Sequence, residues 1–295
     1  MKALRTFREK YFPSFSDRLF FLCGLLMLCS EIWKQYMLTF PLGGGAYNWW
    51  YFPFQLCSIP MYILAAYPWL RRPGIRRTLL AFLMCYTLLG GIAVFADTSG
   101  LHYAYAPLTV HSYLWHCLLI LLGILSGFVY FRSFENENTL CAFAGSTGLY
   151  LICCAAAEVF NLTFDRFGEI NMFYINPDYR MQQIVFRDLS LVIGNLPAIL
   201  LYIAVTVLGA FLLLLAWRLL FGLLLRRILR RKDKEQDNDL QRGGQLHLER
   251  HLHKARDHKE QQGQRTEEHV LIIAVQKLEH HHHDHKEPQD KIDDK

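Results

Sequence analysis

The sequence has few charged residues and lacks the repeats and cysteine patterns that mark several classes of protein. Only 19% of its 295 residues are Asp, Glu, Lys or Arg, whereas 53% are hydrophobic. It contains no regular glycine period, no long heptad series, and no Cys-x-x-Cys pair among its eight cysteines. These absences exclude a collagen-like chain, a coiled coil and a small disulfide-stabilised domain.

The composition changes sharply near residue 231. Residues 1–231 contain 19 Lys and Arg, 11 Asp and Glu, and long apolar runs. Residues 232–295 contain 12 Lys and Arg, 15 Asp and Glu, and almost no apolar run. Ten of the 13 histidines lie in the second part. Runs of about 20 apolar residues match the hydrocarbon core of a bilayer. The sequence therefore predicts a membrane domain at 1–231, which is not a soluble globular enzyme, and a disordered, charged, His-rich cytoplasmic tail at 232–295.

We expect an all-α membrane protein built as a six-transmembrane-helix bundle, because a lone segment in lipid must satisfy its own backbone hydrogen bonds. The predicted spans cover residues 18–38, 48–69, 77–96, 109–131, 139–161 and 191–221. Basic residues precede the first span, fill the loop after the second and follow the sixth. By the positive-inside rule, both termini are expected in the cytoplasm of a multi-pass cell-membrane protein.

Three chemically useful residues are predicted at one depth in the outer half of the bundle. Glu31, Cys57 and His116 each lie about seven or eight residues below the outer end of their span, which corresponds to depths equal within roughly 2 Å. Ionisable residues inside a span are costly and usually functional. Lys34, on the same span as Glu31, is expected to extend toward the outer surface.

Five further polar residues are predicted to bind substrate around this site: Gln55, His111, Glu158, Asn171 and Asn195. A pocket open to the outer leaflet would let these groups avoid hydrocarbon, and membrane lipids are then the expected substrate. No nucleic-acid partner is expected, because most of the positive charge sits at membrane ends. No cofactor and no metal site are expected. The tail histidines could bind a metal adventitiously.

The three residue types at one depth are those of a thiol nucleophile. A thiol becomes reactive when a histidine accepts its proton, and a carboxylate can orient the imidazole. Taken singly, each residue also has an ordinary explanation: Cys57 as a packed apolar side chain, and His116 and Glu31 as hydrogen-bonding groups between helices.

Several stretches resemble the YwaF-like family of bacterial integral membrane proteins, which is similar to the transmembrane protein 164 acyltransferase of ether phospholipids. The resemblance covers about residues 15–222 and is carried by Glu31, Pro53-Phe-Gln-Leu-Cys-Ser58, His111-Ser-Tyr-Leu-Trp-His116, Gly168-Glu-Ile-Asn-Met-Phe-Tyr174 and Gly194-Asn-Leu-Pro197. It implies that Cys57 is an acyl-accepting nucleophile and His116 its base, with His111 as a second candidate. Gln55 stands where the family has a histidine, and the first tyrosine of the family element that begins at Asn171 is missing.

Three functions stay open from the sequence. The chain could be a thiol-dependent lipid acyltransferase, or a lipid hydrolase if water accepts the acyl group. It could instead be a small transporter or ligand-binding membrane protein, which would use the same polar pocket. The third interpretation is a non-catalytic membrane assembly factor.

Overall fold

The computed structural model describes residues 14–134, 138–223 and 270–273. These residues form helices and loops and include no β-strand, which confirms the predicted helical class. Contacts divide the chain into two units, Met1–Gly222 and Leu223–Lys295. The predicted tail lies outside the described residues, apart from the helical turn at 270–273. The fold and the site described below belong to the first unit.

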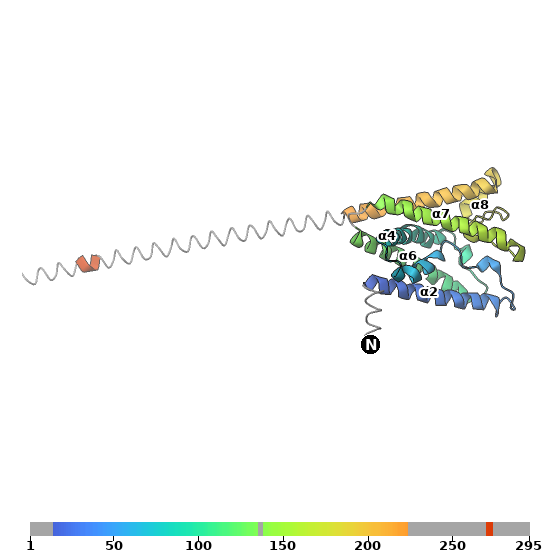
Figure 1. The fold of residues 1–295 in the computed structure, drawn as a ribbon, viewed down its shortest axis with the longest axis horizontal. Helices are drawn as coiled ribbons and strands as arrows, with labels where there is room; N and C mark the ends of the chain where they lie inside the picture. Colours follow the sequence, from blue (N-terminus) through green and yellow to red (C-terminus); the bar gives the residue numbers. More distant parts are fainter. Residues whose placement is uncertain (1–13, 135–137, 224–269, 274–295) are drawn as a thin grey trace, which may run out of the picture. The chain divides into compact units, whose positions relative to one another are not determined.

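The described residues of this unit, in which Figure 1 labels α2, α4, α6, α7 and α8, contain the α-helices α2 to α8 and one further long helix. They are α2 (Phe15–Thr39), α3 (Ile59–Ala66), α4 (Pro73–Phe82), α5 (Leu88–Ala93), α6 (Ala106–Ser133), α7 (Thr139–Phe164), α8 (Ile184–Ile193) and the last helix, Asn195–Leu223. Short helical turns join them: η1 (Trp49–Tyr51), η2 (Tyr67–Trp69), η3 (Leu83–Thr87), η4 (Val94–Ala96), η5 (Ser99–Leu101), η6 (Asp165–Phe167) and η7 (Met172–Tyr174).

Four helices of the described part are long and apolar enough to cross a membrane: Pro73–Ala96, Ala106–Ser133, Thr139–Phe167 and Asn195–Leu223. They correspond to the predicted spans at 77–96, 109–131, 139–161 and 191–221, and they support a membrane protein. Helix α2 occupies the predicted span at 18–38. The count of six spans and the cytoplasmic placement of the termini stay predictions.

The prediction of one continuous helix at 48–69 is wrong. The chain forms η1, then an irregular segment at 52–58, and only then the eight-residue helix α3. Pro53 and Pro60 have no N–H to donate, and Pro60 occupies the first turn of α3, where that loss costs least. At about 1.5 Å per residue α3 is far too short to cross a bilayer. The irregular segment therefore needs hydrogen-bond partners from elsewhere in the bundle.

The last helix begins later than predicted. Gly194 has φ +91°, a conformation that glycine adopts without strain, and it ends α8. The chain then turns into the helix that starts at Asn195. Residues 191–193 consequently belong to α8 and not to the sixth predicted span.

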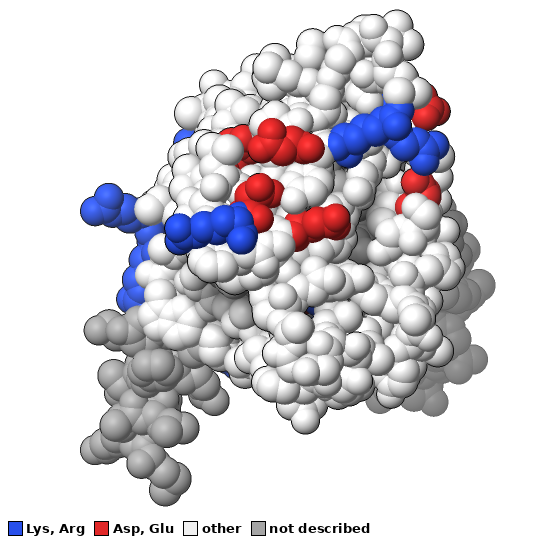
Figure 2. All heavy atoms as spheres, turned by 90° about the vertical axis from the view of Figure 1, so that its right-hand side faces the viewer, with Lys and Arg blue, Asp and Glu red and all other residues white. Residues whose placement is uncertain are grey.

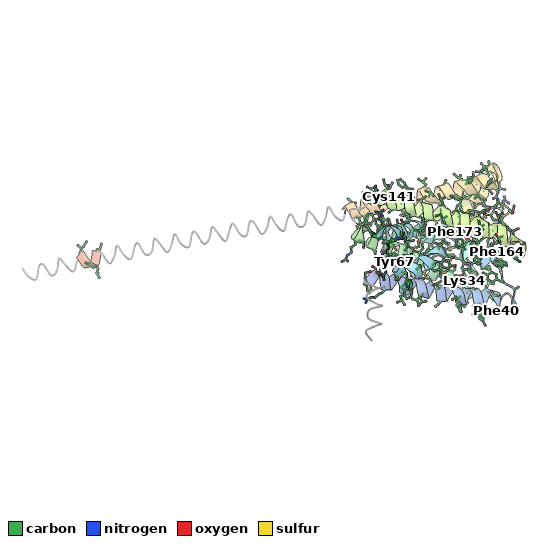
Figure 3. The ribbon with its side chains drawn as sticks, in the orientation of Figure 1. Lys34, Phe40, Tyr67, Cys141, Phe164 and Phe173 are labelled. Atoms are coloured by element: carbon green, nitrogen blue, oxygen red, sulfur yellow. The ribbon has the colours of Figure 1, made fainter. Side chains whose placement is uncertain are left out.

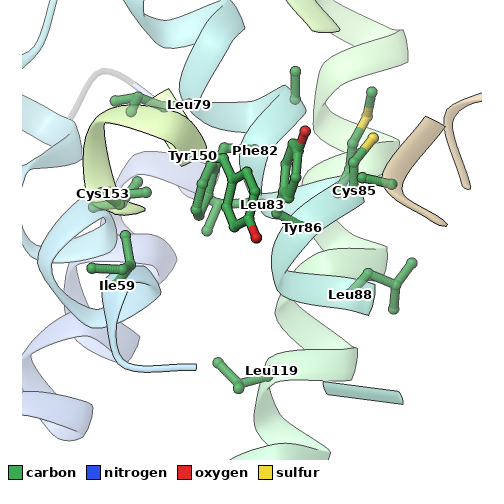
Figure 4. Packing of buried hydrophobic residues seen from close by; sticks show 14 of the residues in the cluster. Ile59, Leu79, Phe82, Leu83, Cys85, Tyr86, Leu88, Leu119, Tyr150 and Cys153 are labelled. Carbon is green, nitrogen blue, oxygen red and sulfur yellow. The ribbon is translucent and has the colours of Figure 1, made fainter. Parts of the chain in front are cut away.

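The helix Pro73–Ala96 lies at the centre of the bundle: 61% of its most apolar stretch is buried, against 28% for Asn195–Leu223. Tyr86 stacks on Phe82 and on Tyr150 of α7, with ring centroids 5.4 and 4.8 Å away (Figure 4). The Tyr86 hydroxyl shares a 2.8 Å hydrogen bond with Thr147. Offset aromatic stacking of this kind adds to the burial of apolar area, so these rings fix α7 against the central helix.

A π-helical turn, η3, interrupts the central helix at Leu83–Thr87. The indole N–H of Trp217, on the last helix, donates to the Met84 carbonyl at 3.1 Å. The Trp217 ring lies so close to Gly127 of α6 that a Cβ added at Gly127 would be 2.4 Å from it. Trp217 thus attaches the last helix to both α6 and the π turn.

The two ends of the bundle differ in charge. We call the end that carries Arg71, Arg76, Arg77 and Arg132 the arginine end; Tyr67 and Cys141 mark it in Figure 3, and Lys34, Phe40 and Phe164 mark the opposite end. At the arginine end, Arg76 of α4 pairs with the buried carboxylate of Asp17 on α2 and lies over the Tyr67 ring, 4.1 Å from its centroid. This pair joins the beginnings of α2 and α4.

Helix α2 packs against α3 through Gly24, where an added Cβ would lie 2.4 Å from the Ala65 backbone nitrogen and 2.8 Å from the Leu64 carbonyl carbon. We expect Gly24→Ala to destabilise the fold by about 1–3 kcal/mol, because backbone atoms cannot move aside as a side chain can. A fall in the thermal unfolding temperature of the detergent-solubilised protein would measure the effect.

The matched control is Gly148→Ala in α7, because nothing lies within 4 Å of a Cβ at that position. Alanine is the better helix former, so this variant should unfold at the same or a slightly higher temperature. Equal unfolding temperatures for the two variants would contradict the close α2–α3 packing.

Candidate functional site

A cavity of about 410 Å³ opens at the end of the bundle opposite the arginine end. Its wall comes from α2, the irregular segment at 52–58, residues 94–103, the first turns of α6, and the loop between α7 and α8. The charged residues that line it are Glu31, Lys34 and Asp97, and the aromatic ones are Trp50, Tyr51, Phe52, Tyr103, Trp115 and Tyr174. The cavity wall therefore combines charged groups with aromatic side chains.

Five of the eight residues predicted for the site line this one cavity: Glu31, Gln55, Cys57, His111 and His116. They come from α2, the irregular segment and α6, which are far apart in the sequence. The other three, Glu158, Asn171 and Asn195, do not line it. The described structure thus brings together the three types of group needed for thiol chemistry.

Cys57 lies in the irregular segment, and a side chain of α6 fixes its backbone. The Trp115 indole N–H donates to the Cys57 carbonyl at 3.1 Å, which satisfies a backbone group that a helix would have paired. All eight cysteines are free thiols, and Cys57 is the one that lines the cavity. Cys117, next to His116 in the chain, is exposed on the outside of α6.

His116 is oriented by its own helix. Its Nδ1 lies 2.8 Å from the Ser112 carbonyl oxygen. A carbonyl can only accept, so Nδ1 carries the proton and Nε2 is left as an acceptor. Nε2 has no hydrogen-bond partner among the described residues, and the side chain lines the cavity. This is the tautomer that a general base needs.

No hydrogen bond joins the Cys57 thiol to either imidazole within the described residues. The second histidine, His111, shares a 2.5 Å hydrogen bond with the Ser30 hydroxyl through Nε2. Its ring lies between those of Trp33 and Trp115, with each centroid 5.6 Å away. His111 is therefore fixed in the wall between α2 and α6, and His116 is the freer acceptor.

Glu31 does not orient an imidazole as predicted. One of its carboxylate oxygens accepts from Lys34 at 2.8 Å and from the Gln35 amide at 2.7 Å. Gln35 also donates to the Tyr51 carbonyl at 2.6 Å, which connects the pair to η1. The side chains of Glu31 and Lys34 are 5% and 16% exposed, so the ion pair is shielded from solvent at the cavity wall. Partner hydrogen bonds are what make such a buried pair tolerable.

Gln55 joins the irregular segment to the loop between α7 and α8. Its amide donates to the Asn171 carbonyl at 2.9 Å and accepts from the Phe173 N–H at 2.7 Å. Phe173 and Tyr174 have φ of 56° and 58°, a left-handed conformation that costs a non-glycine residue free energy. Gln55 thus holds a strained turn, and the second residue of that turn, Tyr174, lines the cavity.

The three predicted residues outside the cavity support the same loop. Asn161 of α7, whose amide also contacts Glu158 at 3.3 Å, accepts from the Met172 N–H at 2.7 Å. The Asn171 side chain accepts from the Asn176 N–H at 3.0 Å. Asn195 donates to the Pro177 and Tyr179 carbonyls and accepts from the Met181 N–H, all within 2.9 Å. These amides hold the loop, and the Asn171 side-chain nitrogen is buried without a hydrogen-bond partner within the described residues.

Several acidic side chains are visible on the face shown in Figure 2, with Lys and Arg side chains beside and between them. In the cavity wall, a hydrogen bond from the Ser99 backbone holds the pKa of Asp97 below its usual range, so the carboxylate is ionised at neutral pH. Burial raises the pKa of Tyr174 to about 12, so its hydroxyl keeps its proton at neutral pH. The wall thus contains a fixed negative charge and a neutral hydroxyl group.

Sequence reasoning did not identify Lys34, Asp97, Trp115 or Tyr174 as part of the site. Lys34 was expected to extend outward, but the neighbouring Glu31 one turn away keeps it in the cavity wall. The i, i+3 spacing of these opposite charges was the available signal. Trp115 and Tyr174 lie within the motifs that carry the family resemblance, but the sequence carried no signal of their roles, which depend on how an irregular segment and a loop fold.

Within the described residues, no group of three His, Cys, Asp or Glu side chains is placed to hold a metal ion. The histidine run of the predicted tail lies outside those residues. The site is therefore considered below through its protein groups alone.

No protein-family model, curated protein or solved structure matches this chain. The resemblance to the YwaF-like family thus rests on the quoted motifs, and function has to be argued from the geometry of the cavity.

We expect Gln55→Ala to release the loop between α7 and α8, because it leaves the Phe173 N–H and the Asn171 carbonyl without their partner. An unsatisfied buried group costs about 1–3 kcal/mol. The exposed Arg180 in this loop should then be cut faster by trypsin. The rate of appearance of that cleavage product on the folded protein measures the effect.

Gln182→Ala serves as the control, because Gln182 lines the same cavity but its side chain makes no hydrogen bond within the described residues. It should be cut at the wild-type rate. Equal protection of Arg180 in Gln55→Ala and wild type would show that Gln55 does not hold the loop.

Proposed function

We propose that this chain is a multi-pass cell-membrane enzyme of the YwaF-like type, which transfers the acyl group of a membrane lipid through the Cys57 thiol. One observation carries the proposal. The only thiol in the cavity wall faces the same space as an imidazole whose Nε2 is an unpartnered acceptor among the described residues. A thiol and a base in one enclosed polar site are the minimum for nucleophilic acyl transfer.

In the proposed first half-reaction, His116 Nε2 takes the thiol proton, directly or through one water, as Cys57 Sγ attacks the ester carbonyl of the lipid. The bond between the carbonyl carbon and the leaving oxygen breaks, and His116 returns the proton to that oxygen. The products are a thioester on Cys57 and a lysolipid. Apo sites often show longer donor–acceptor distances than the reacting complex, so the missing thiol–imidazole bond is compatible with this step.

In the second half-reaction, an acceptor hydroxyl attacks the thioester carbonyl while His116 takes its proton. The carbon–sulfur bond breaks, and the proton goes to Cys57 Sγ, which restores the thiol. A lysolipid acceptor makes the protein an acyltransferase, and water makes it a lipid hydrolase. The cavity supports both, because the same groups serve either acceptor.

Lys34 is the group best suited to stabilise the oxyanion. Gln55 and Asn195, which the sequence predicted to bind substrate, are instead bonded to loop backbone. Lys34 lines the cavity, and with Glu31 it acts electrostatically on the Cys57 side chain. A preorganised cation in a site shielded from water stabilises developing negative charge by a few kcal/mol. Glu31 then keeps Lys34 in position.

The charge distribution supports an orientation with the cavity in the outer leaflet. Four arginines lie at the arginine end: Arg71 and Arg72 before α4, and Arg76 and Arg77 in its first turns. The cavity at the opposite end is lined by the Glu31–Lys34 ion pair and the carboxylate of Asp97. By the positive-inside rule the arginine end is cytoplasmic, which accords with six passes and two cytoplasmic termini.

A second candidate function is a ligand-binding or transport protein. It is favoured by the irregular segment at 52–58 and the π turn at 83–87, because interrupted helices often mark transport sites. It needs the cavity but not the thiol, so the experiment below separates the two. A non-catalytic assembly factor would likewise tolerate loss of the thiol.

We expect Cys57→Ala to lower acyl transfer to background, because the nucleophile is lost. His116→Ala should lower it by about 10²–10⁴-fold, the usual contribution of a general base. The measurement is transfer of a labelled acyl chain from phospholipid to lysolipid or water by the full chain in lipid nanodiscs. Intact-protein mass spectrometry should show the acyl adduct on wild type and not on Cys57→Ala.

Cys117→Ala is the control, because it removes a thiol one residue from His116 on the exposed side of α6. It should keep full activity and the adduct. If Cys57→Ala turned over at the wild-type rate, the proposed mechanism would be wrong, and lipid transfer without any adduct would point to another nucleophile.

A further inference from the structure

A second, apolar hollow lies beside the cavity, on the outer surface of the bundle between α2 and α6. It has a volume of about 290 Å³. Its apolar wall is formed by Leu26 and Met27 of α2 and by Leu114 and Leu118 of α6. We call it the α2–α6 groove. Because the leucines at positions 26 and 114 are 59% and 64% exposed, the groove opens outward and not into the core.

The groove and the cavity share a wall. His111 and Trp115 line both, and Ser30, which is hydrogen-bonded to His111 at 2.5 Å, lines the groove. The Ser30–His111 pair therefore bridges α2 and α6 where the apolar groove meets the polar cavity. On the cavity side, Trp115 also holds the Cys57 carbonyl. A ligand that followed this wall would pass from an apolar surface to the neighbourhood of the thiol.

The surroundings of the groove determine what can occupy it. Helix α6 is one of the four helices that are long and apolar enough to cross a membrane. Other large apolar side chains on the two helices of the groove are also exposed, among them Leu22 of α2 and Val110 and Leu121 of α6. In a bilayer such exposed side chains meet hydrocarbon. What fills an apolar groove on this surface is a lipid acyl chain.

We infer that the α2–α6 groove holds one acyl chain of a membrane phospholipid, with the chain reaching the cavity past the Ser30–His111 pair. The inference rests on the proposed function and adds the route by which its lipid substrate arrives: sideways from the bilayer, as an intact long-chain phospholipid. The polar headgroup then lies toward the Glu31–Lys34 pair and Asp97 in the cavity. Short water-soluble esters, which cannot fill the groove, are poor substrates.

The test measures binding and needs no turnover. The full chain is purified in detergent and mixed with one equivalent of a phosphatidylcholine that carries a diazirine in the middle of one acyl chain. After irradiation, peptide mass mapping locates the labelled residues. We expect labelling to concentrate on the groove residues of α2 and α6, equally in wild type and in Cys57→Ala.

The decisive pair of variants is Leu114→Trp and Leu121→Trp. Both leucines are on α6, both are 64% exposed, and they lie two turns apart on nearly the same face, but only Leu114 lines the groove. Leu114→Trp should fill the groove and lose most of the labelling, whereas Leu121→Trp should keep it. Equal unfolding temperatures for the two would show that the loss is local.

Even labelling around the bundle, or labelling that Leu114→Trp leaves unchanged, would overturn the groove inference. If the wild type nevertheless transferred acyl groups, the proposed function would be supported and only the groove inference would be rejected. Labelling confined to the groove in a protein that transfers no acyl group would uphold the groove as a lipid site and reject the proposed function.

Discussion

The Gln55 side chain is the contact on which the site depends, because it pairs two stretches of backbone that form no regular structure. Its side-chain amide donates to the Asn171 carbonyl and accepts from the Phe173 N–H, as a backbone peptide group would in a β-bridge. In a bundle of apolar helices an unpaired peptide group is expensive, and a segment that leaves the helical conformation must find partners elsewhere. Through this amide, the segment that carries Cys57 and the loop that carries Tyr174 stabilise each other.

This arrangement separates structural from chemical roles among the polar residues. The amides of Gln55, Asn161, Asn171 and Asn195 hold irregular backbone in place. Cys57, His116 and Lys34 keep capacity for a ligand. The four amides are bonded to loop backbone, whereas His116, although its Nδ1 is bonded to the Ser112 carbonyl, keeps Nε2 as an acceptor. Packing of the Trp115 ring in the wall between α2 and α6 adds the rigidity that a positioned nucleophile needs.

Much of the helix pattern follows from the sequence, because apolar runs separated by Gly, Pro and charged residues locate long helices. The predicted ranges at 77–96, 109–131 and 139–161 fall within helices of the structure. The failure at 48–69 came from treating every apolar run as one helix. Pro53 and Pro60 were visible, but the outside partners that make an irregular segment tolerable, such as Trp115, could not be read from a linear sequence.

Which residues gather in the cavity could be predicted better than what each of them bonds to. The regular rise of a helix predicted one level for Glu31, Cys57 and His116, and all three line the cavity. The direction in which each side chain points, and what it meets, depends on how the helices rotate and pack. That is why Glu31 pairs with Lys34 and Gln35, and why the Ser112 carbonyl, not a carboxylate, sets the tautomer of His116.

The π turn at Leu83–Thr87 has a geometric consequence for the bundle. Each residue of an α-helix advances the side chains by about 100° around the axis, and a π turn contains roughly one residue more than an α turn. The side chains of α5 are therefore turned relative to a straight continuation of α4. One helix can in this way present an apolar face to α7 along its first half and to α6 along its second half. Deleting a single residue of this turn would rotate all the following side chains of the helix by about 100° around its axis. The rotation would reach Val94 and Asp97, which line the cavity.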